Sequence, residues 1–179
     1  METTLTAVDA PVNSSTPQHA TLAVTGHRPP RLGGYTEEVE RRLARVADET
    51  IAALAPARVF TGMAQGWDLA IAEACARAGL PFVAALPFPA PDARWPEAQR
   101  RRLRGLLERA AEVTALSDAP SPGAYHRRDR WMVERAELLV ALWDGSRSGG
   151  TFSTVRSAEK RNVPVHNVWP RWLATADDR

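Results

Sequence analysis

The glycine-rich segment at residues 144–151 has the clearest potential for chemistry, because it follows an apolar run and precedes a predicted helix. Glycines let backbone N–H groups approach an anion closely, and a helix N-terminus adds partial positive charge. Gly149, Gly150 and Thr151 therefore predict a phosphate or ribose-phosphate site, with a further hydroxyl donor at Ser153. The alternative is a flexible strand-to-helix turn. The segment lacks both the Gly-Lys-Ser/Thr of a Walker motif and the spacing of the dinucleotide fingerprint.

A second strand–turn–helix segment spans residues 61–68 and carries Gly62 and Gly66. Asp68 falls in the first turn of the helix that follows. Its carboxylate can accept a hydrogen bond from a ribose hydroxyl, or it can simply interact with the helix dipole. The pattern makes Gly62, Gly66 and Asp68 candidate ligand contacts.

The loop after the first predicted strand supplies Gly26, His27 and Arg28. Arg28 suits contact with an anion, and His27 can act as an acid, a base or a phosphate donor, although a lone loop histidine often does none of these. His27, His126 and His166 do not show the spacing of metal ligands, so no metal is expected.

Two further features have both a functional and a structural interpretation. Trp95 follows a proline-rich loop and can stack on a base or cover the core. The basic cluster at residues 126–130 opens a helix, and such a cluster is usually a solvated face. Here one arginine can point inward, toward the glycine loop.

These segments must be positioned by alternating strands and helices. Apolar runs predict strands at residues 21–25, 58–61, 81–86, 112–116, 138–143 and 163–168, and helical patterns lie between them. Thr36 is the expected N-cap of the first helix, and the last helix is expected over residues 151–161. We therefore predict an α/β, Rossmann-like fold with a mostly parallel sheet and helices on both faces, in which ligands bind at the carboxyl ends of the strands.

Length and composition fit one domain. The chain has 179 residues and a net charge of +2, which does not by itself argue for nucleic acid. Residues 1–19 are predicted to be a disordered tail, residues 20–173 a single domain, and residues 174–179 a short tail. Tryptophans 131, 169 and 172 are candidates for an oligomer interface.

A single cysteine, Cys75, excludes a disulfide framework and fits a small core residue. No apolar run approaches the length of a membrane span, and the N-terminus lacks a signal-peptide pattern. We therefore expect a cytoplasmic protein without membrane contact.

Together, the motifs resemble those of the SLOG superfamily, specifically its YpsA-like branch, over about residues 21–168. The resemblance lies in several segments in one order: 25–29 with 33–34, 62–68, 87–88 with 95–96, 128–133, and 143–145 with 149–151. It implies a Rossmann-like fold and a nucleotide or nucleotide-derived ligand, without a further cofactor.

Two relatives within that superfamily suggest alternatives. Arg128 and Met132 match the arginine–methionine spacing of LOG-type phosphoribohydrolases, but aligning Gly150 and Thr151 on their Gly-Thr puts Thr154 where those enzymes carry a glutamate. Residues 62–68 resemble a segment of DNA-processing protein A, which binds single-stranded DNA.

The favoured hypothesis is a sensing or processing module that binds a nucleotide-like molecule, with Arg128 and Thr154 added to the contacts above. The first alternative is an N-glycosidic hydrolase acting on a nucleoside monophosphate or an ADP-ribose-like substrate, with Arg128 and Asp68 as its catalytic residues. The second alternative, ranked last, is single-stranded DNA binding through Trp95 and residues 100–104. The sequence leaves open whether any reaction is catalysed.

Overall fold

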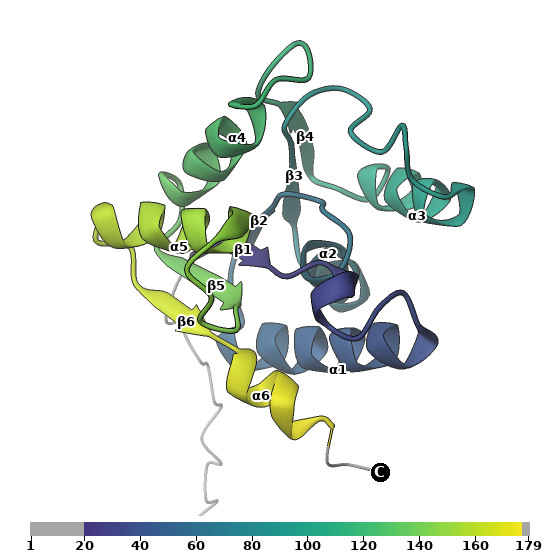
Figure 1. Ribbon diagram of the computed structural model, residues 1–179, viewed down its shortest axis with the longest axis vertical. Coiled ribbons are helices and arrows are strands. Elements are labelled where there is room, and N and C mark those ends of the chain that lie inside the picture. The colour runs from purple at the N-terminus through teal and green to yellow at the C-terminus, as the bar shows by residue number, and fades with distance from the viewer. Residues whose placement is uncertain (1–19, 177–179) are drawn as a thin grey trace, which may run out of the picture.

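The structure is a computed structural model that describes residues 20–176 (Figure 1). Strands and helices alternate along the chain. The strands are β1 (Thr21–Gly26), β2 (Arg58–Thr61), β3 (Phe82–Leu86), β4 (Glu112–Ala115), β5 (Leu138–Leu142) and β6 (Val165–Asn167). The helices are α1 (Glu37–Leu54), α2 (Trp67–Ala78), α3 (Glu97–Leu107), α4 (Ala124–Val133), α5 (Gly149–Lys160) and α6 (Trp169–Ala174), with a 3₁₀ turn η1 at Pro29–Arg31.

The strands form one sheet in the order β4-β3-β2-β1-β5-β6, and all five pairings are parallel. The chain first moves outward from β1 to β4 and then returns through α4 to place β5 on the other side of β1. The strand order therefore reverses between β1 and β5. In open α/β sheets, the crevice at such a reversal is where ligands bind.

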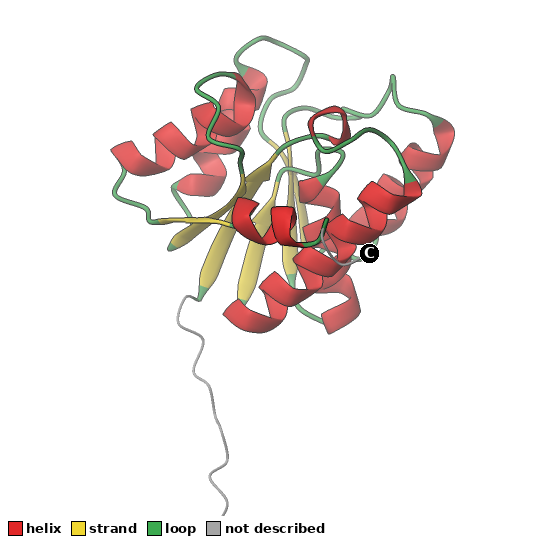
Figure 2. Cartoon of the chain, turned by 60° about the horizontal axis from the view of Figure 1, so that its bottom comes forward, coloured by secondary structure: helices red, strands yellow, loops and turns green. Residues whose placement is uncertain are grey.

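Alternate residues of each strand face opposite layers of helices. Leu22, Val24 and Val140 pack in the core on the side of α1, α2 and α6, whereas Ala23 and Leu139 face α4 and α5. Figure 2 shows helices on both faces of the sheet. The predicted α/β, Rossmann-like fold is confirmed.

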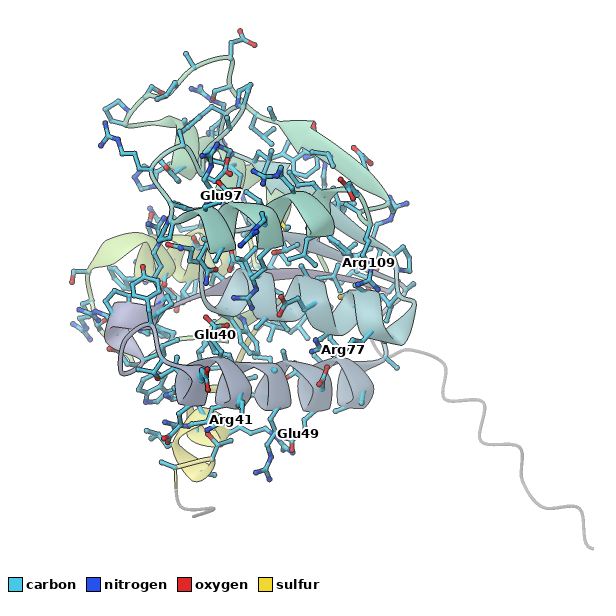
Figure 3. The ribbon with its side chains drawn as sticks, turned by 90° about the vertical axis from the view of Figure 1, so that its right-hand side faces the viewer. Glu40, Arg41, Glu49, Arg77, Glu97 and Arg109 are labelled. Carbon is cyan, nitrogen blue, oxygen red and sulfur yellow. The ribbon has the colours of Figure 1, made fainter. Side chains whose placement is uncertain are left out.

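Helices α1, α2 and α3 lie side by side on one face (Figure 3). Ion pairs connect them: Arg102 of α3 donates to Glu73 of α2 and Glu40 of α1, and Arg77 of α2 donates to Asp48 of α1. None of the helices within residues 20–176 is long and apolar enough to cross a membrane.

Local signals account for most element ends. The Thr36 hydroxyl accepts a hydrogen bond from Val39 N at 3.2 Å, so Thr36 is the N-cap of α1 as predicted. Gly79 closes α2 in the left-handed conformation. Cys75 is buried, as expected for a core residue.

Three features of the C-terminal part differ from the sequence prediction. Helix α5 begins at Gly149, two residues early, because the two glycines belong to its first turn. The short helix α6, which contains Pro170 in its first turn, was not predicted, since six residues carry too little periodicity. It places Trp172 in the core, 3% exposed, so Trp172 is not available for the oligomer interface suggested from the sequence.

The predicted tails lie largely outside the described part of the chain. Residues 1–19 and 177–179 are not described. The first residue of the expected C-terminal tail, Ala174, is the last residue of α6.

Candidate functional site

A cavity of about 540 Å³ opens at the carboxyl end of β1, where the strand order reverses. Segments far apart in sequence line it: the end of β1 and its loop, the turn before α2 together with Asp68, helix α4, and the first turn of α5. The lining residues are Val24, Thr25, Gly26, His27, Arg28, Arg31, Ala64, Asp68, Tyr125, Arg128, Asp129, Ser148, Gly149, Gly150 and Thr151.

The first turn of α5 supplies hydrogen-bond donors to this cavity. Its N-cap, Ser148, makes no side-chain hydrogen bond to the helix, so the first N–H groups have no capping acceptor. Gly149 adopts φ +88°, a conformation that favours glycine, whereas Gly150 has no positive φ and faces open space. The turn therefore has the backbone of an anion-binding helix N-terminus.

Arg128 of α4 is the buried cation of the site. It is 5% exposed, and its Nη1 donates a hydrogen bond to the Gly62 carbonyl oxygen. A Cβ on Gly62 would lie 2.5 Å from Arg128 Cζ and 2.9 Å from Asp68 Oδ2. Gly62 is thus required by the Arg128 guanidinium that packs over it.

Asp68 is a buried carboxyl group whose partners leave it incompletely satisfied. It is 6% exposed, and among the described residues its carboxylate accepts one hydrogen bond, from Ala64 N to Oδ2 at 3.4 Å. Burial raises the pKa of Asp68 to about 6; the positive charge of Arg128 opposes this rise and the negative charge of Asp129 adds to it. Asp68 Oδ1 is therefore available to a ligand.

Asp129 is a second carboxylate in the cavity that the sequence did not single out. Arg128 Nε lies 2.7 Å from Asp129 Oδ1, although its N–H is not aimed at that oxygen. The Thr154 hydroxyl lies 3.1 Å from Asp129 Oδ2 and 3.0 Å from the Gly150 carbonyl oxygen. A carboxylate of the cavity is thus held beside the buried hydroxyl of Thr154.

His27, Asp144 and Arg31 connect the β1 loop to the glycine loop. His27 Nε2 lies 2.8 Å from Asp144 Oδ1, and Arg31 Nη1 donates to Asp144 Oδ2 at 3.0 Å. Partial burial raises the pKa of Asp144, but hydrogen bonds from Ser146 and His27 outweigh that effect and hold the pKa well below its usual range. The His27 ring also packs edge-on against Trp169. These contacts fix the rim of the cavity.

Eight of the predicted site residues line the cavity together: Gly26, His27, Arg28, Asp68, Arg128, Gly149, Gly150 and Thr151. The others lie nearby or elsewhere. Gly66 packs against the His27 carbonyl, and Thr154 is buried behind Asp129. Ser153 contacts His126 outside this cavity, and Trp95, just before α3, is partly buried against the core.

Seven lining residues were not among the predicted site residues: Val24, Thr25, Arg31, Ala64, Tyr125, Asp129 and Ser148. Asp129 directly follows Arg128, so its position in the same motif was the available signal. No group of three or more His, Cys, Asp or Glu residues within the described ranges is arranged to hold a metal ion.

The parallel sheet and the cavity at its strand reversal define the class of protein. It is a Rossmann-like domain with a crevice at the position where such domains bind ligands. A family model, described as the YspA SLOG family, matches residues 22–173, and the chain belongs to this family. This confirms the resemblance drawn from the motifs. No curated protein sequence matches the chain.

Solved structures share the fold at low sequence identity. DNA processing protein A of Helicobacter pylori, described for its single-stranded DNA binding mode, is 17% identical with a TM-score of 0.58, over 92% of this chain and 75% of that one. The Streptococcus pneumoniae protein of the same name matches at 17% identity and TM-score 0.58 over 81% of this chain; the match spans about half (48%) of that longer chain. The molybdenum cofactor binding protein of Rippkaea orientalis is 14% identical, with a TM-score of 0.54 over 90% of this chain and 85% of that one.

Proposed function

We propose that the chain binds a nucleotide-derived phosphate ligand in the cavity at the β1–β5 reversal and acts as a sensing or processing module. The observation that carries this proposal is the pairing, in one cavity, of uncapped N–H groups at the start of α5 with a buried carboxylate that has a free oxygen. The N–H groups, with Arg28, suit a phosphate. Asp68 suits a hydroxyl donor rather than an anion.

This division of donors and acceptors gives the ligand an orientation. The helices that carry the two groups follow β5 and β2, the strands on either side of β1. The phosphate lies on the first turn of α5, and a free ribose hydroxyl donates to Asp68. The exposed ring of Tyr125, which packs edge-on against Phe88, offers a surface on which a base can stack.

Substitution of Gly150 tests the proposal without threatening the fold. A Cβ there meets no atom within 4 Å, and alanine favours the helix, so Gly150→Ala should fold normally. We expect it to weaken binding of nucleoside monophosphates or ADP-ribose at least tenfold, because the methyl group occupies the approach to the N–H groups. Gly150→Asp should abolish binding by charge repulsion, while its carboxylate remains favourable at a helix N-terminus. Calorimetric titration measures both effects.

Gly105→Ala is the matched control, because Gly105 lies in α3 and a Cβ there also meets nothing within 4 Å. It should leave binding unchanged. Failure of the wild-type chain to bind any nucleotide of the panel, or equal binding by both alanine variants, would contradict the proposal.

A second candidate function is N-glycosidic hydrolysis, which the position of Asp129 favours. The Asp129 carboxylate contacts the hydroxyl of Thr154, the residue that replaces the LOG-type glutamate. Asp68, with its pKa raised to about 6, can serve as an acid near neutral pH. In this reaction water adds to C1′ of the ribose while the base leaves with a proton, and the positive charge of Arg128 lies beside both carboxylates.

Release of free base from nucleoside monophosphates tests this candidate by chromatography. We expect Asp129→Asn and Asp68→Asn each to reduce release at least a hundredfold while binding is retained within about tenfold, since general acid–base catalysis contributes roughly 10²–10⁴-fold. Undiminished release in both variants would remove these carboxylates from the mechanism. Absence of release by the wild-type chain leaves binding as the function.

Part of the region first considered for single-stranded DNA binding is engaged in ion pairs within the chain. Arg102 is bound by Glu73 and Glu40, and Arg104 donates to Glu97 at 2.8 Å. These ion pairs compete with phosphate contacts. The relatives with the same fold nevertheless include proteins described as binding single-stranded DNA and a molybdenum cofactor, so ligand binding is a shared use of this architecture.

A further inference from the structure

A second cavity, of about 430 Å³, lies between α4 and α5 and shares Asp129 with the first. The basic cluster at residues 126–130 is divided between the two cavities. Arg128 turns into the first cavity, whereas His126, Arg127 and Arg130 line the second. The nucleotide site proposed above uses none of these last three side chains.

The second cavity is rich in donors and poor in acceptors. Ser153 and Ser157 lie one turn apart on α5, in the other wall. The Ser153 hydroxyl lies 3.3 Å from His126 Nδ1, and the Ser157 hydroxyl accepts a hydrogen bond from Arg161 and keeps its own proton to donate. Among residues 20–176, Arg127 makes no ion pair, and its hydrogen bond goes to the neutral hydroxyl of Ser117. The Arg130 guanidinium lies 3.8 Å from the Glu134 carboxylate, and both side chains are largely exposed, so little of the Arg130 charge is neutralised.

The acidic residue in the wall does not cancel this positive charge. Asp129 already faces Arg128 Nε at 2.7 Å and the Thr154 hydroxyl at 3.1 Å. Arg127 and Arg130 therefore give this cavity a net positive charge beside the two serine hydroxyls. Guanidinium and hydroxyl groups are the donors that typically bind oxyanions.

We propose that this second cavity is an oxyanion site for a second phosphate of the ligand held in the first cavity. The inference rests on the proposed function. Along α5, Gly150 and the two serines are separated by about 5–10 Å at 1.5 Å per residue. The two phosphates of a diphosphate share one bridging oxygen and are too close together for this spacing. The spacing fits a phosphate–ribose–phosphate unit, as in a nucleoside 3′,5′-bisphosphate or in one step of an oligonucleotide.

The test compares adenosine 5′-monophosphate with adenosine 3′,5′-bisphosphate by calorimetric titration at fixed salt. The same pair of nucleotides is titrated for each of the other three bases. The wild-type chain should bind the bisphosphate at least tenfold more tightly. Arg127→Gln should weaken the bisphosphate roughly tenfold, the size of one lost charge-assisted hydrogen bond, and should change the monophosphate less than twofold. Ser153→Ala should act in the same direction. Arg101→Gln, at an exposed arginine of α3, should change neither.

A short single-stranded oligonucleotide in the same titration distinguishes the two sources of this unit. Tighter binding by the oligonucleotide than by the bisphosphate identifies a polynucleotide, and the reverse identifies a small molecule. Equal affinity for monophosphate and bisphosphate, or an equal loss of both in Arg127→Gln, overturns the second site and leaves the proposed function standing. Absence of binding by every probe overturns both.

Discussion

Gly66→Ala is expected to lower the free energy of unfolding by about 3 kcal/mol, the sum of backbone strain and a steric clash. Gly66 adopts φ +94° and ψ −123°, a conformation essentially restricted to glycine. A Cβ there would lie 2.8 Å from the His27 carbonyl oxygen and 3.1 Å from Pro29 Cδ. Neither atom can yield without moving the loop that carries Arg28, so ligand binding should weaken as well. Urea unfolding followed by tryptophan fluorescence measures the loss of stability.

Gly79→Ala separates the two contributions. Gly79 also has a positive φ, +65°, but a Cβ there meets nothing within 4 Å. We expect a loss of about 1 kcal/mol, from the left-handed conformation alone. Equal losses in the two variants would show that the contact between Gly66 and the β1 loop does not constrain the fold.

Asp68→Asn is expected to stabilise the chain at neutral pH. The pKa of Asp68 is raised to about 6 in the folded chain, mainly because of burial, from the ordinary aspartate value of about 3.9. The folded state therefore holds its proton more tightly than the unfolded state, and the ionised carboxyl destabilises the fold. That cost is absent below pH 4, grows between pH 4 and 6, and is complete above pH 6. This rise in pKa corresponds to roughly 3 kcal/mol, of which we expect about 1–3 kcal/mol to appear in the variant.

The measurement is the difference in unfolding free energy between Asp68→Asn and the wild-type chain at pH 4.5, 6 and 8. The difference should rise with pH and level off above pH 6. Asp118→Asn, which removes an exposed carboxylate after β4, is the control and should give a difference near zero throughout. A pH-independent difference for Asp68→Asn would show that the carboxyl is not buried as described. Stabilisation together with weaker ligand binding is the pattern expected at a functional site.

Local sequence patterns were sufficient for the fold. Each strand is a short apolar run that ends at glycine, proline or polar residues, and each helix of ten or more residues has periodicity or a cap to mark it. All six strands were therefore predicted within about two residues at each end. Helix α6 was missed because a six-residue helix is stabilised by packing Trp172 into the core, a contact that local periodicity does not record.

The candidate site was predictable only in part. The glycine loops and Arg128 were found because strand-to-helix turns at the carboxyl ends of parallel strands must converge. Asp129 was not found, because its role depends on the rotation of α4 about its axis. That rotation sends Arg128 into the first cavity and Arg127 into the second, and places Asp129 in the wall between them. Helix rotation is fixed by packing and not by composition.

The glycine-rich loops separate what the sequence determines about the site from what only the tertiary structure determines. The sequence by itself determined that glycines stand at the strand ends, and hence where a ligand crevice forms. It did not determine why each is glycine. Gly149 needs its backbone conformation, Gly62 makes room for Arg128 and Gly66 for the β1 loop, whereas Gly150 is open to the cavity. The neighbours of Gly62 and Gly66 are distant in the chain, so only the folded structure distinguishes a glycine that packs from one that faces a ligand.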